Sequence, residues 1–218
     1  MNKEFLHRII SSLVLITLSF FFIIKGSIIF NCFIFVMFLV TLYEWHKMSK
    51  KNSFNVFGHI FLIFSFISVY NLRNSFGENS VNIFFLILII CISTDIGGYA
   101  FGKTLKGPKL IKISPKKTYA GMIGGYLFSI LMVYLYCKYS NLVSIYNLKF
   151  TNQILFITFL TSTVSQIGDV IISYFKRLSK IKDTGNIIPG HGGLLDRIDG
   201  MIFAFPFSYI IFSINLIK

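Results

Sequence analysis

Val81-Asn-Ile-Phe-Phe-Leu-Ile-Leu-Ile-Ile-Cys-Ile-Ser-Thr-Asp-Ile-Gly-Gly-Tyr-Ala-Phe101 is a continuous apolar stretch whose only charged residue is Asp95. A helix needs about 20 mainly apolar residues to cross the hydrocarbon core of a bilayer. The stretch does not alternate apolar with polar residues, as a half-buried strand would. It therefore predicts a membrane-spanning helix with a carboxylate and two glycines near its end.

Six further apolar stretches lie on either side of this one, at residues 9–24, 27–43, 56–69, 119–137, 152–172 and 201–217. The 218 residues are 55% hydrophobic and only 13% charged, a balance too apolar for a water-soluble domain. We therefore predict an all-α fold, a polytopic transmembrane helical bundle of about seven spans.

The amino-terminal stretches are the least constrained part of this prediction. Lys3 and Arg8 precede residues 9–24 as in a secretory signal, but Ile23-Ile24-Lys25-Gly26 offers no small-x-small cleavage site, so a retained anchor is predicted. Residues 56–69 are few for a full crossing, and a tilted or partly interfacial helix stays open. We treat residues 1–80 as amino-terminal transmembrane helices and residues 81–218 as the domain that carries the two large loops, 102–118 and 173–200.

The net charge of +13 follows the loops between the predicted spans. If seven spans alternate in direction, one side of the membrane holds 16 Lys and Arg residues and the other side holds 5. Such an excess marks the cytoplasmic side. The amino terminus is therefore predicted to be cytoplasmic and the carboxyl terminus external, and the charge does not call for a nucleic acid partner.

The three cysteines are far apart, and all lie inside or at the ends of apolar stretches: Cys32, Cys91 and Cys137. Neither a disulfide framework nor a metal-ligand spacing is visible. We interpret all three as residues of the packed core.

Acidic residues gather around the two largest predicted cytoplasmic loops, which hold or adjoin five of the eight: Asp95, Asp169, Asp183, Asp196 and Asp199. Membrane orientation needs only Lys and Arg, so the carboxylates indicate a further role. In the second loop, Pro189-Gly190-His191-Gly192-Gly193 can form tight turns with positive φ that bring backbone N–H groups close to an anion.

Asp196 and Asp199 are three residues apart, so a helix that begins near Leu194 would place both carboxylates on one face. The two charges repel each other unless a cation lies between them. Mg²⁺ that also holds phosphate oxygens would serve, whereas the simpler interpretation is a carboxylate pair that complements a helix dipole.

Asp169 ends the predicted span 152–172 on the same side of the membrane and could supply a third ligand. The simpler interpretation here is an ion pair with Lys176 or Arg177. Both interpretations stay open at the level of sequence.

The segment Ser114-Pro-Lys-Lys-Thr118 opens the predicted span 119–137. Two ammonium groups beside a helix amino terminus form an anion site that suits a triphosphate. The pattern G-x-x-x-x-G-K-[ST] is absent, so a P-loop is not indicated. The same lysines are also typical of a patch that binds anionic lipid headgroups.

Residues 173–199 resemble the signature of the CDP-diacylglycerol synthase (phosphatidate cytidylyltransferase) family. The resemblance rests on Ser173, Lys176-Arg177, Lys182-Asp183, Pro189-x-His-Gly-Gly193 and Asp196-Arg-x-Asp199. Asp95 to Lys103 and Ser114 to Thr118 resemble two further family segments, so the resemblance covers roughly residues 90–200. Ala120 stands where family members often carry Glu or Gln, and the chain is short for the family.

The resemblance implies transfer of a cytidylyl group from CTP to phosphatidate, with Mg²⁺ as cofactor, in a bacterial-type inner membrane with the site facing the cytoplasm. It implies catalytic roles for Asp169, Lys176, Asp196 and Asp199, of which the three aspartates would hold the metal. The substrate-binding residues that it implies are Ser114, Lys116, Lys117, Thr118, Ser173, Arg177, Lys182, His191, Gly192, Gly193 and Arg197. Asp95, Tyr99 and Asp183 have no assigned role, and a companion monovalent cation and a homodimer stay open.

Three other classes of protein fit less well. A transporter whose ion path used Asp95 and Asp169 would place them at mid-membrane, whereas both lie at predicted cytoplasmic ends. A CDP-alcohol phosphatidyltransferase would carry Asp-Gly-x-x-Ala-Arg, but Asp199-Gly200 is followed by Met-Ile-Phe. A non-catalytic assembly protein with a basic lipid-binding face would leave the clustered carboxylates unexplained.

The basic-residue count predicts which loops can be labelled from outside the cell. A single cysteine placed near Asn79 or Asn141 should react with an impermeant thiol reagent, whereas one placed near Lys106 or Thr184 should not. Strong external labelling of the 173–200 loop would reverse the predicted orientation.

Overall fold

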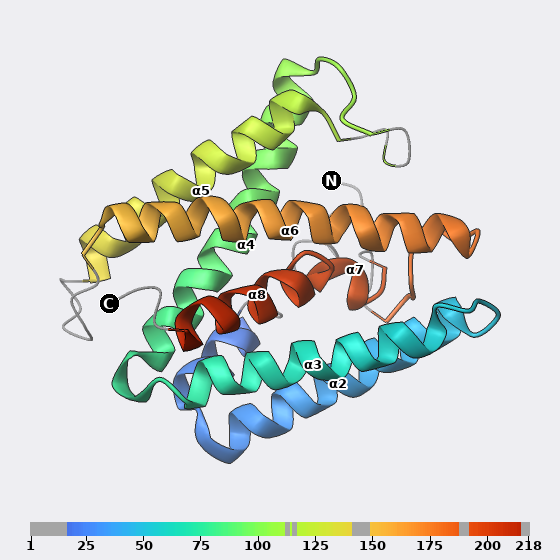
Figure 1. Cartoon of the computed structure of the whole chain (residues 1–218), viewed down its shortest axis with the longest axis horizontal. Coiled ribbons are helices and arrows are strands. Elements are labelled where there is room, and N and C mark those ends of the chain that lie inside the picture. The colour runs from blue at the N-terminus through green and yellow to red at the C-terminus, as the bar shows by residue number, and fades with distance from the viewer. Residues whose placement is uncertain (1–16, 112–113, 115–116, 141–148, 188–191, 215–218) are drawn as a thin grey trace, which may run out of the picture.

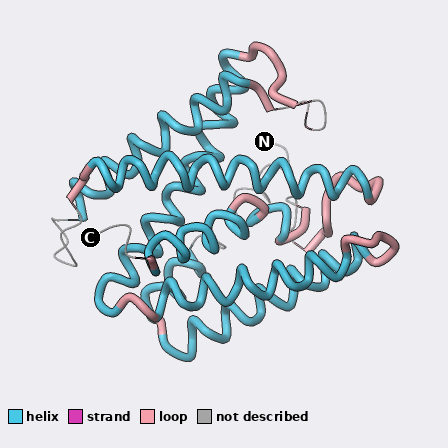
Figure 2. Tube along the Cα trace, viewed as in Figure 1, coloured by secondary structure: helices cyan, strands magenta, loops and turns pink. Residues whose placement is uncertain are grey.

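The computed structural model describes residues 17–111, 114, 117–140, 149–187 and 192–214. Within these ranges the chain is helical and its helices are joined by loops, with one isolated antiparallel bridge between Lys109 and Thr118 (Figures 1 and 2). Residues 17–25 are also helical. The elements are α2 Ser27–Ser49, α3 Asn55–Asn74, η1 Gly77–Asn79, α4 Ser80–Leu105, α5 Tyr119–Ser140, α6 Asn152–Leu178, α7 Leu195–Ile198 and α8 Met201–Ser213.

Five of the helical segments are long and apolar enough to cross a membrane: Ser27–Ser49, Asn55–Asn74, Gly77–Leu105, Tyr119–Ser140 and Asn152–Leu178. The predicted helical membrane bundle is therefore confirmed. The stretch at 56–69, which seemed short, belongs to a helix of 20 residues. Helix α8 has only 13 residues, about 20 Å at 1.5 Å per residue. Because the first predicted span lies partly outside the described residues, the count of seven stays a prediction.

The helices include two antiparallel pairs, and α8 lies between α6 and α3 (Figure 1). Helices α4 and α5 form the first pair and pack closely along their length, and α6 crosses them (Figure 1). Helices α2 and α3 form the second pair, and α8 lies against both α3 and α6. A cluster of buried apolar side chains joins α2, α3, α4 and α8 through Phe30, Leu72, Phe84, Ile87 and Phe205.

Glycines allow α4 and α5 to approach closely. A Cβ at Gly97 would lie 2.6 Å from the Gly124 carbonyl oxygen, and one at Gly121 would lie 2.7 Å from the Gly98 carbonyl oxygen. Small residues at such crossings let helix backbones touch within a membrane. Helix α5 begins where the Thr118 hydroxyl accepts a hydrogen bond from the Gly121 N–H, at 3.1 Å.

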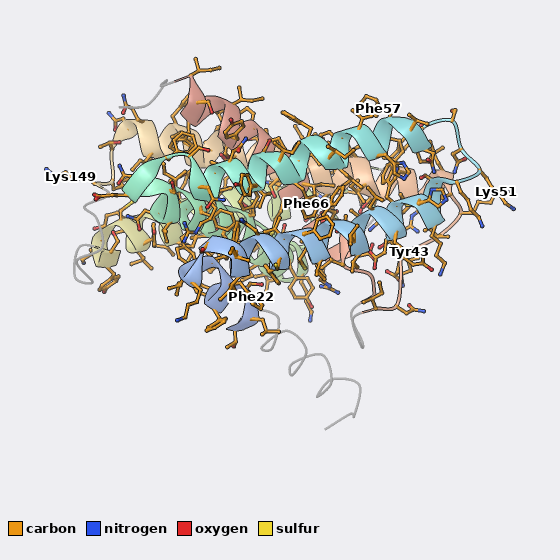
Figure 3. All side chains as sticks on the ribbon, turned by 90° about the horizontal axis from the view of Figure 1, so that it is seen from below. Phe22, Tyr43, Lys51, Phe57, Phe66 and Lys149 are labelled. Carbon is orange, nitrogen blue, oxygen red and sulfur yellow. The ribbon has the colours of Figure 1, made fainter. Side chains whose placement is uncertain are left out.

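The outer surface of the α2–α3 pair is apolar and aromatic. Tyr43 and Phe57 are exposed on these helices, whereas Phe66 is buried between them and their neighbours, and Lys51 and Lys149 lie at opposite ends of the molecule (Figure 3). Cys91 and Cys137 are buried as predicted, but Cys32 is exposed, so its assignment to the core was wrong. Cys32 lies on α2, an outer helix of the bundle, where an apolar residue can face lipid instead of protein.

The close crossing of α4 and α5 can be tested with neighbouring glycines. Gly97→Ala would press a methyl group onto the Gly124 carbonyl and the Phe128 Cβ, both at 2.6 Å, and should lower stability by roughly 1–3 kcal/mol. Gly98→Ala is the control, because its nearest neighbour would lie at an ordinary 3.6 Å. Melting temperatures in detergent measure both, and equal values would contradict the described crossing.

Candidate active site

A cavity of about 350 Å³ lies where α4, α5 and α6 meet the loop before α5 and the turn after α7. Its lining is rich in polar side chains although three membrane-length helices form its walls. The lining residues are Thr94, Asp95, Gly98, Tyr99, Leu110, Ser114, Lys117, Thr118, Gly121, Met122, Gln166, Asp169, Asp196 and Asp199. The two loops that the sequence singled out thus contribute to one cavity.

Lys117 and Asp169 join these two parts of the sequence directly. The Lys117 ammonium lies 2.5 Å from Asp169 Oδ2 and donates a hydrogen bond to the Gln166 carbonyl oxygen at 3.3 Å. Asp169 Oδ1 accepts a longer hydrogen bond from the Ser173 hydroxyl, at 3.4 Å. Asp169 therefore pairs with Lys117, and the alternative pairing with Lys176 or Arg177 is wrong because both project from the next turns of the same helix toward other partners.

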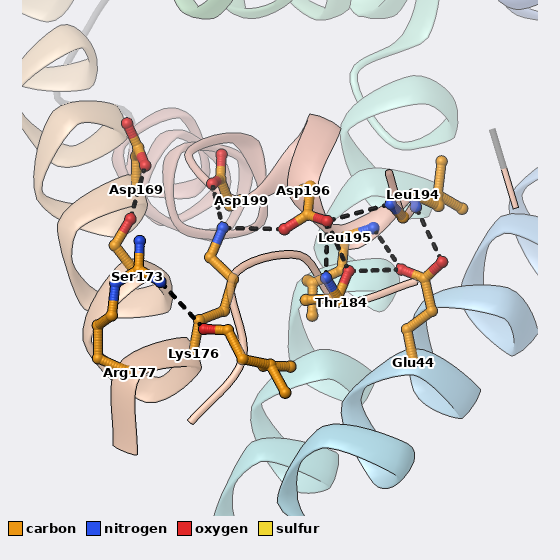
Figure 4. A network of polar contacts seen from close by, with 12 residues as sticks. Glu44, Asp169, Ser173, Lys176, Arg177, Thr184, Leu194, Leu195, Asp196 and Asp199 are labelled. Carbon is orange, nitrogen blue, oxygen red and sulfur yellow. Dashed lines mark hydrogen bonds and ion pairs between the residues drawn. The ribbon is translucent and has the colours of Figure 1, made fainter. Parts of the chain in front are cut away.

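Lys176 is the cation that lies between Asp196 and Asp199 (Figure 4). Its ammonium lies 2.8 Å from Asp196 Oδ1 and 3.9 Å from Asp199 Oδ2, and the residue is only 8% exposed. Helical backbone angles continue from α7 through Asp199 and Gly200 into α8, so both carboxylates lie on one helical face as predicted. The repulsion between them is offset by a buried ammonium.

Asp196 has a full set of hydrogen-bond donors. Its Oδ2 accepts from the Thr184 N–H at 2.8 Å and the Gly193 N–H at 3.0 Å, and the Thr184 hydroxyl, whose one proton Asp196 shares with Glu44, lies at 3.1 Å. Burial alone would raise the pKa of Asp196, but Lys176 and these backbone donors outweigh it and hold the pKa below its usual value. The ionised form of Asp196 therefore stabilises the fold.

For Asp199, the effects that raise the pKa outweigh those that lower it. Burial raises the pKa of Asp199 well above its usual value, and the negative charge of Asp169 raises it further. Lys176 and the N–H of Gly200, which donates to Asp199 Oδ1 at 2.9 Å, offset only part of this effect. An ionised Asp199 is therefore costly to the fold and attracts a cation.

Glu44 is a member of the same network that the sequence analysis missed. It lies on α2, is 1% exposed, and accepts hydrogen bonds from Thr184, Leu194 and Leu195 (Figure 4). The sequence gives one weak indication of its role. Glu44 is one of only eight acidic residues and directly follows the predicted span 27–43. The resemblance, which covers residues 90–200, gave no reason to examine it.

The glycine-rich turn binds anions of the protein itself. Gly192 has a φ of 89°, a left-handed conformation that glycine adopts readily, as predicted. The N–H of Gly193 donates to Asp196, and those of Leu194 and Leu195 donate to Glu44. In this structure the described N–H groups therefore hold carboxylates, and substrate contacts by Gly192 and Gly193 stay predictions.

The remaining predicted site residues fall into three groups. Ser114, Thr118, Asp95 and Tyr99 line the cavity, and the Tyr99 hydroxyl accepts a hydrogen bond from Lys103 at 3.3 Å. Four predicted residues of the 173–200 segment have exposed side chains: Arg177, Lys182, Asp183 and Arg197. Arg177 donates a hydrogen bond to the Ile181 carbonyl oxygen at 3.1 Å. Lys116 and His191 lie outside the described residues.

The donor set of the cavity suits a hard divalent cation. In the part of the chain that the structure describes, no three His, Cys, Asp or Glu side chains converge closely enough to hold a metal by themselves. Asp95, Asp169 and Asp199 nevertheless line one cavity with like charges, a set that a cation completed by phosphate oxygens and water would satisfy. Asp196 fits less directly, because both its oxygens already accept hydrogen bonds.

The cavity and its bundle define a helical membrane protein with a charged site, whose Asp95 and Asp169 lie inside α4 and α6 and not, as the sequence predicted, at the ends of these helices. Residues 60–215 match the pattern of the family described as "Cytidylyltransferase family". The chain is 39% identical over 215 residues to the phosphatidate cytidylyltransferase of Rickettsia bellii, covering 95% of this chain and 89% of that protein. It is 34% identical to that of Rickettsia typhi, covering 96% and 91%. With the Bacillus subtilis enzyme, 35% identity extends over 68% of this chain and 52% of that protein.

The chain belongs to the cytidylyltransferase family, as the motifs at 95–103, 114–118 and 173–199 predicted. It is thus a nucleotidyltransferase of the membrane. The Rickettsia relatives match it over nearly their whole length, so the chain is short only by comparison with relatives such as the Bacillus protein.

The opposite pKa shifts predict opposite effects on stability. Asp196→Asn removes a stabilising charge and leaves the Lys176 ammonium buried with a weaker partner, so it should lower stability by roughly 3 kcal/mol or more. Asp199→Asn removes a charge that is costly to bury and should leave the melting temperature unchanged or raise it. Thermal unfolding in detergent measures both, and an equal loss in the two variants would contradict the assigned balance of charges.

Proposed function

We propose that this protein is a phosphatidate cytidylyltransferase that makes CDP-diacylglycerol. A phosphate oxygen of phosphatidate attacks the α-phosphorus of CTP, the bond from that phosphorus to the β-phosphate bridging oxygen breaks, and pyrophosphate leaves. The observation that carries the proposal is the cavity lined by Lys117, Asp169, Asp196 and Asp199, of which the last two are paired with Lys176. The relatives that match nearly the whole chain carry this enzyme name.

Charge neutralisation and positioning dominate catalysis of this kind of reaction, so the lysines of the site are expected to contribute much of the rate acceleration. Lys117 lines the cavity, and its ammonium is held by Asp169 and the Gln166 carbonyl. An incoming triphosphate can accept hydrogen bonds from that ammonium in place of Asp169. The phosphate of phosphatidate is already anionic, so the proposal needs no general base.

A metal ion follows from the electrostatics of the cavity. A triphosphate would enter a space lined by four carboxylates, Asp95, Asp169, Asp196 and Asp199, which would repel it. We propose that Asp169 and Asp199 hold Mg²⁺, and that Asp196 joins them if Lys176 moves. When bound, Mg²⁺ supplies charge neutralisation for the phosphates and for the pyrophosphate that leaves.

The place of the cavity suits one soluble and one lipid substrate. Its walls come from α4, α5 and α6, whereas its rim includes loop residues Leu110, Ser114 and Lys117. The basic ends of these helices support a cytoplasmic site, to which CTP has access, in the inner membrane of a bacterium. A lipid headgroup can reach the same space along the helices.

The proposed reaction is tested with the full chain purified in detergent. Radiolabelled CTP, phosphatidate and Mg²⁺ should yield a labelled product that partitions into organic solvent, and product formation should require both the lipid and the divalent ion. Absence of that product across several phosphatidates and divalent ions would refute the proposed function.

Lys117 provides the sharpest test of the assigned substrate contacts. Lys117→Ala should lower kcat/KM for CTP by about 10²-fold, the size typical of losing one charge-stabilising donor. Lys109→Ala is the matched control, because Lys109 is an exposed lysine of the same loop outside the cavity lining, and should stay within about twofold of the parent chain. If Lys117→Ala kept its kinetics while Lys116→Ala lost them, the assignment of the lysine would be wrong.

A further inference from the structure

Glu44 is a buried carboxylate outside the part of the chain that matches the family pattern, residues 60–215. Its Oε1 accepts a hydrogen bond from the Leu194 N–H at 2.9 Å, and its Oε2 accepts from the Leu195 N–H at 2.8 Å. The Thr184 hydroxyl lies 3.0 Å from Oε2. One side chain of α2 thus contacts both ends of the 184–195 loop.

The partners of Glu44 explain why an acid stands there. Two of the three groups that face it are backbone N–H groups, which can only donate, and a carboxylate is the side chain that only accepts hydrogen bonds. Glutamine has nearly the same shape but would turn an NH₂ group toward at least one donor. An unmade hydrogen bond at a buried site is costly, so the loop would shift to avoid it.

Two glycines leave room for the Glu44 carboxylate. A Cβ at Gly185 would lie 2.8 Å from Glu44 Oε1, and one at Gly193 would lie 2.6 Å from Oε2. Both glycines belong to the loop that Glu44 holds. The two glycines therefore leave space for a side chain from α2.

The hydrogen bonds of Glu44 lead directly to the cavity. Thr184 donates its N–H to Asp196 Oδ2 at 2.8 Å, and its hydroxyl, which has one proton, lies between Glu44 Oε2 and Asp196 Oδ2. Asp196 in turn holds Lys176, which lies between Asp196 and Asp199 (Figure 4). A displaced loop would carry Asp196 away from Lys176 and change the charged wall of the cavity.

We propose that Glu44 is a positioning residue for the cytidylyl transfer reaction, through which the amino-terminal helix α2 holds Asp196 and Lys176 in place. This inference rests on the proposed function. Glu44 itself does not line the cavity, so it acts through the loop and not on the substrate.

The experiment compares Glu44→Gln with the parent chain, full length and in detergent, using CTP, phosphatidate and Mg²⁺. Because misplacement of catalytic groups by about 1 Å can cost 10²-fold, kcat should fall by about 10²-fold, with a smaller change in KM for CTP. Amide hydrogen exchange gives a readout that is independent of activity. The Leu194 and Leu195 amides should exchange at least tenfold faster, whereas amides of α5 should keep their rates.

A matched control and a second variant complete the test. Glu78→Gln makes the same change at an exposed glutamate of η1 and should stay within about twofold of the parent kcat. Gly185→Ala leaves the charge of Glu44 intact but presses on its Oε1, so it should speed exchange of Leu194 and Leu195 and lower kcat. If Glu44→Gln does not accumulate in the membrane, Gly185→Ala alone tests whether Glu44 positions the loop.

Three results would overturn the proposal. The first is a folded Glu44→Gln chain with kcat within threefold of the parent. The second is unchanged exchange at Leu194 and Leu195 in both variants. The third is faster exchange spread equally over α5, which would show general destabilisation. If the parent chain itself forms no labelled lipid, the proposed function fails, while the exchange data still show whether Glu44 holds the loop.

Discussion

The sharing of one buried ammonium by two carboxylates is the interaction on which the candidate site depends. Lys176 is almost fully buried, and an unpaired charge in such a place would cost several kcal/mol. Asp196 supplies the close partner at 2.8 Å, and Asp199 the distant one at 3.9 Å. The two carboxylates differ because Asp196 receives two backbone donors, whereas Asp199 receives one, from Gly200, and is near the negative charge of Asp169. One carboxylate therefore anchors the lysine, and the other keeps an unmet need for positive charge.

This arrangement is possible only because distant segments of the chain are brought close together. Gly97 and Gly121 let α4 and α5 cross with their backbones in contact, so the loop before α5 reaches α6. Lys117 can then meet Asp169 across that junction. On the other side, α2 reaches the 184–195 loop through Glu44. The close packing of α4 and α5 thus positions Lys117 and Asp169, and the buried contacts of Glu44 position the other part of the same site.

The sequence alone predicted the class of fold, and several of the residues it singled out line one cavity in the structure. Apolar length identified the membrane helices, with α5 beginning at Tyr119 as expected, and the spacing of Asp196 and Asp199 correctly placed both on one helical face. Cys32 was placed wrongly because apolar character in a membrane protein does not distinguish lipid contact from core contact.

The partners of individual charges could not be predicted, because they depend on tertiary contacts. The pairing of Asp169 with Lys117 joins residues 52 positions apart, and no local pattern distinguishes that lysine from Lys176 or Arg177. Glu44 was missed for the same reason, since its partners lie about 150 positions away. Within the motif at 189–193, the described N–H of Gly193 binds a side-chain carboxylate of the protein, and binding of a substrate anion stays a prediction. A glycine-rich turn beside a cavity can thus shape the cavity indirectly, because it fixes Asp196, which lines that cavity.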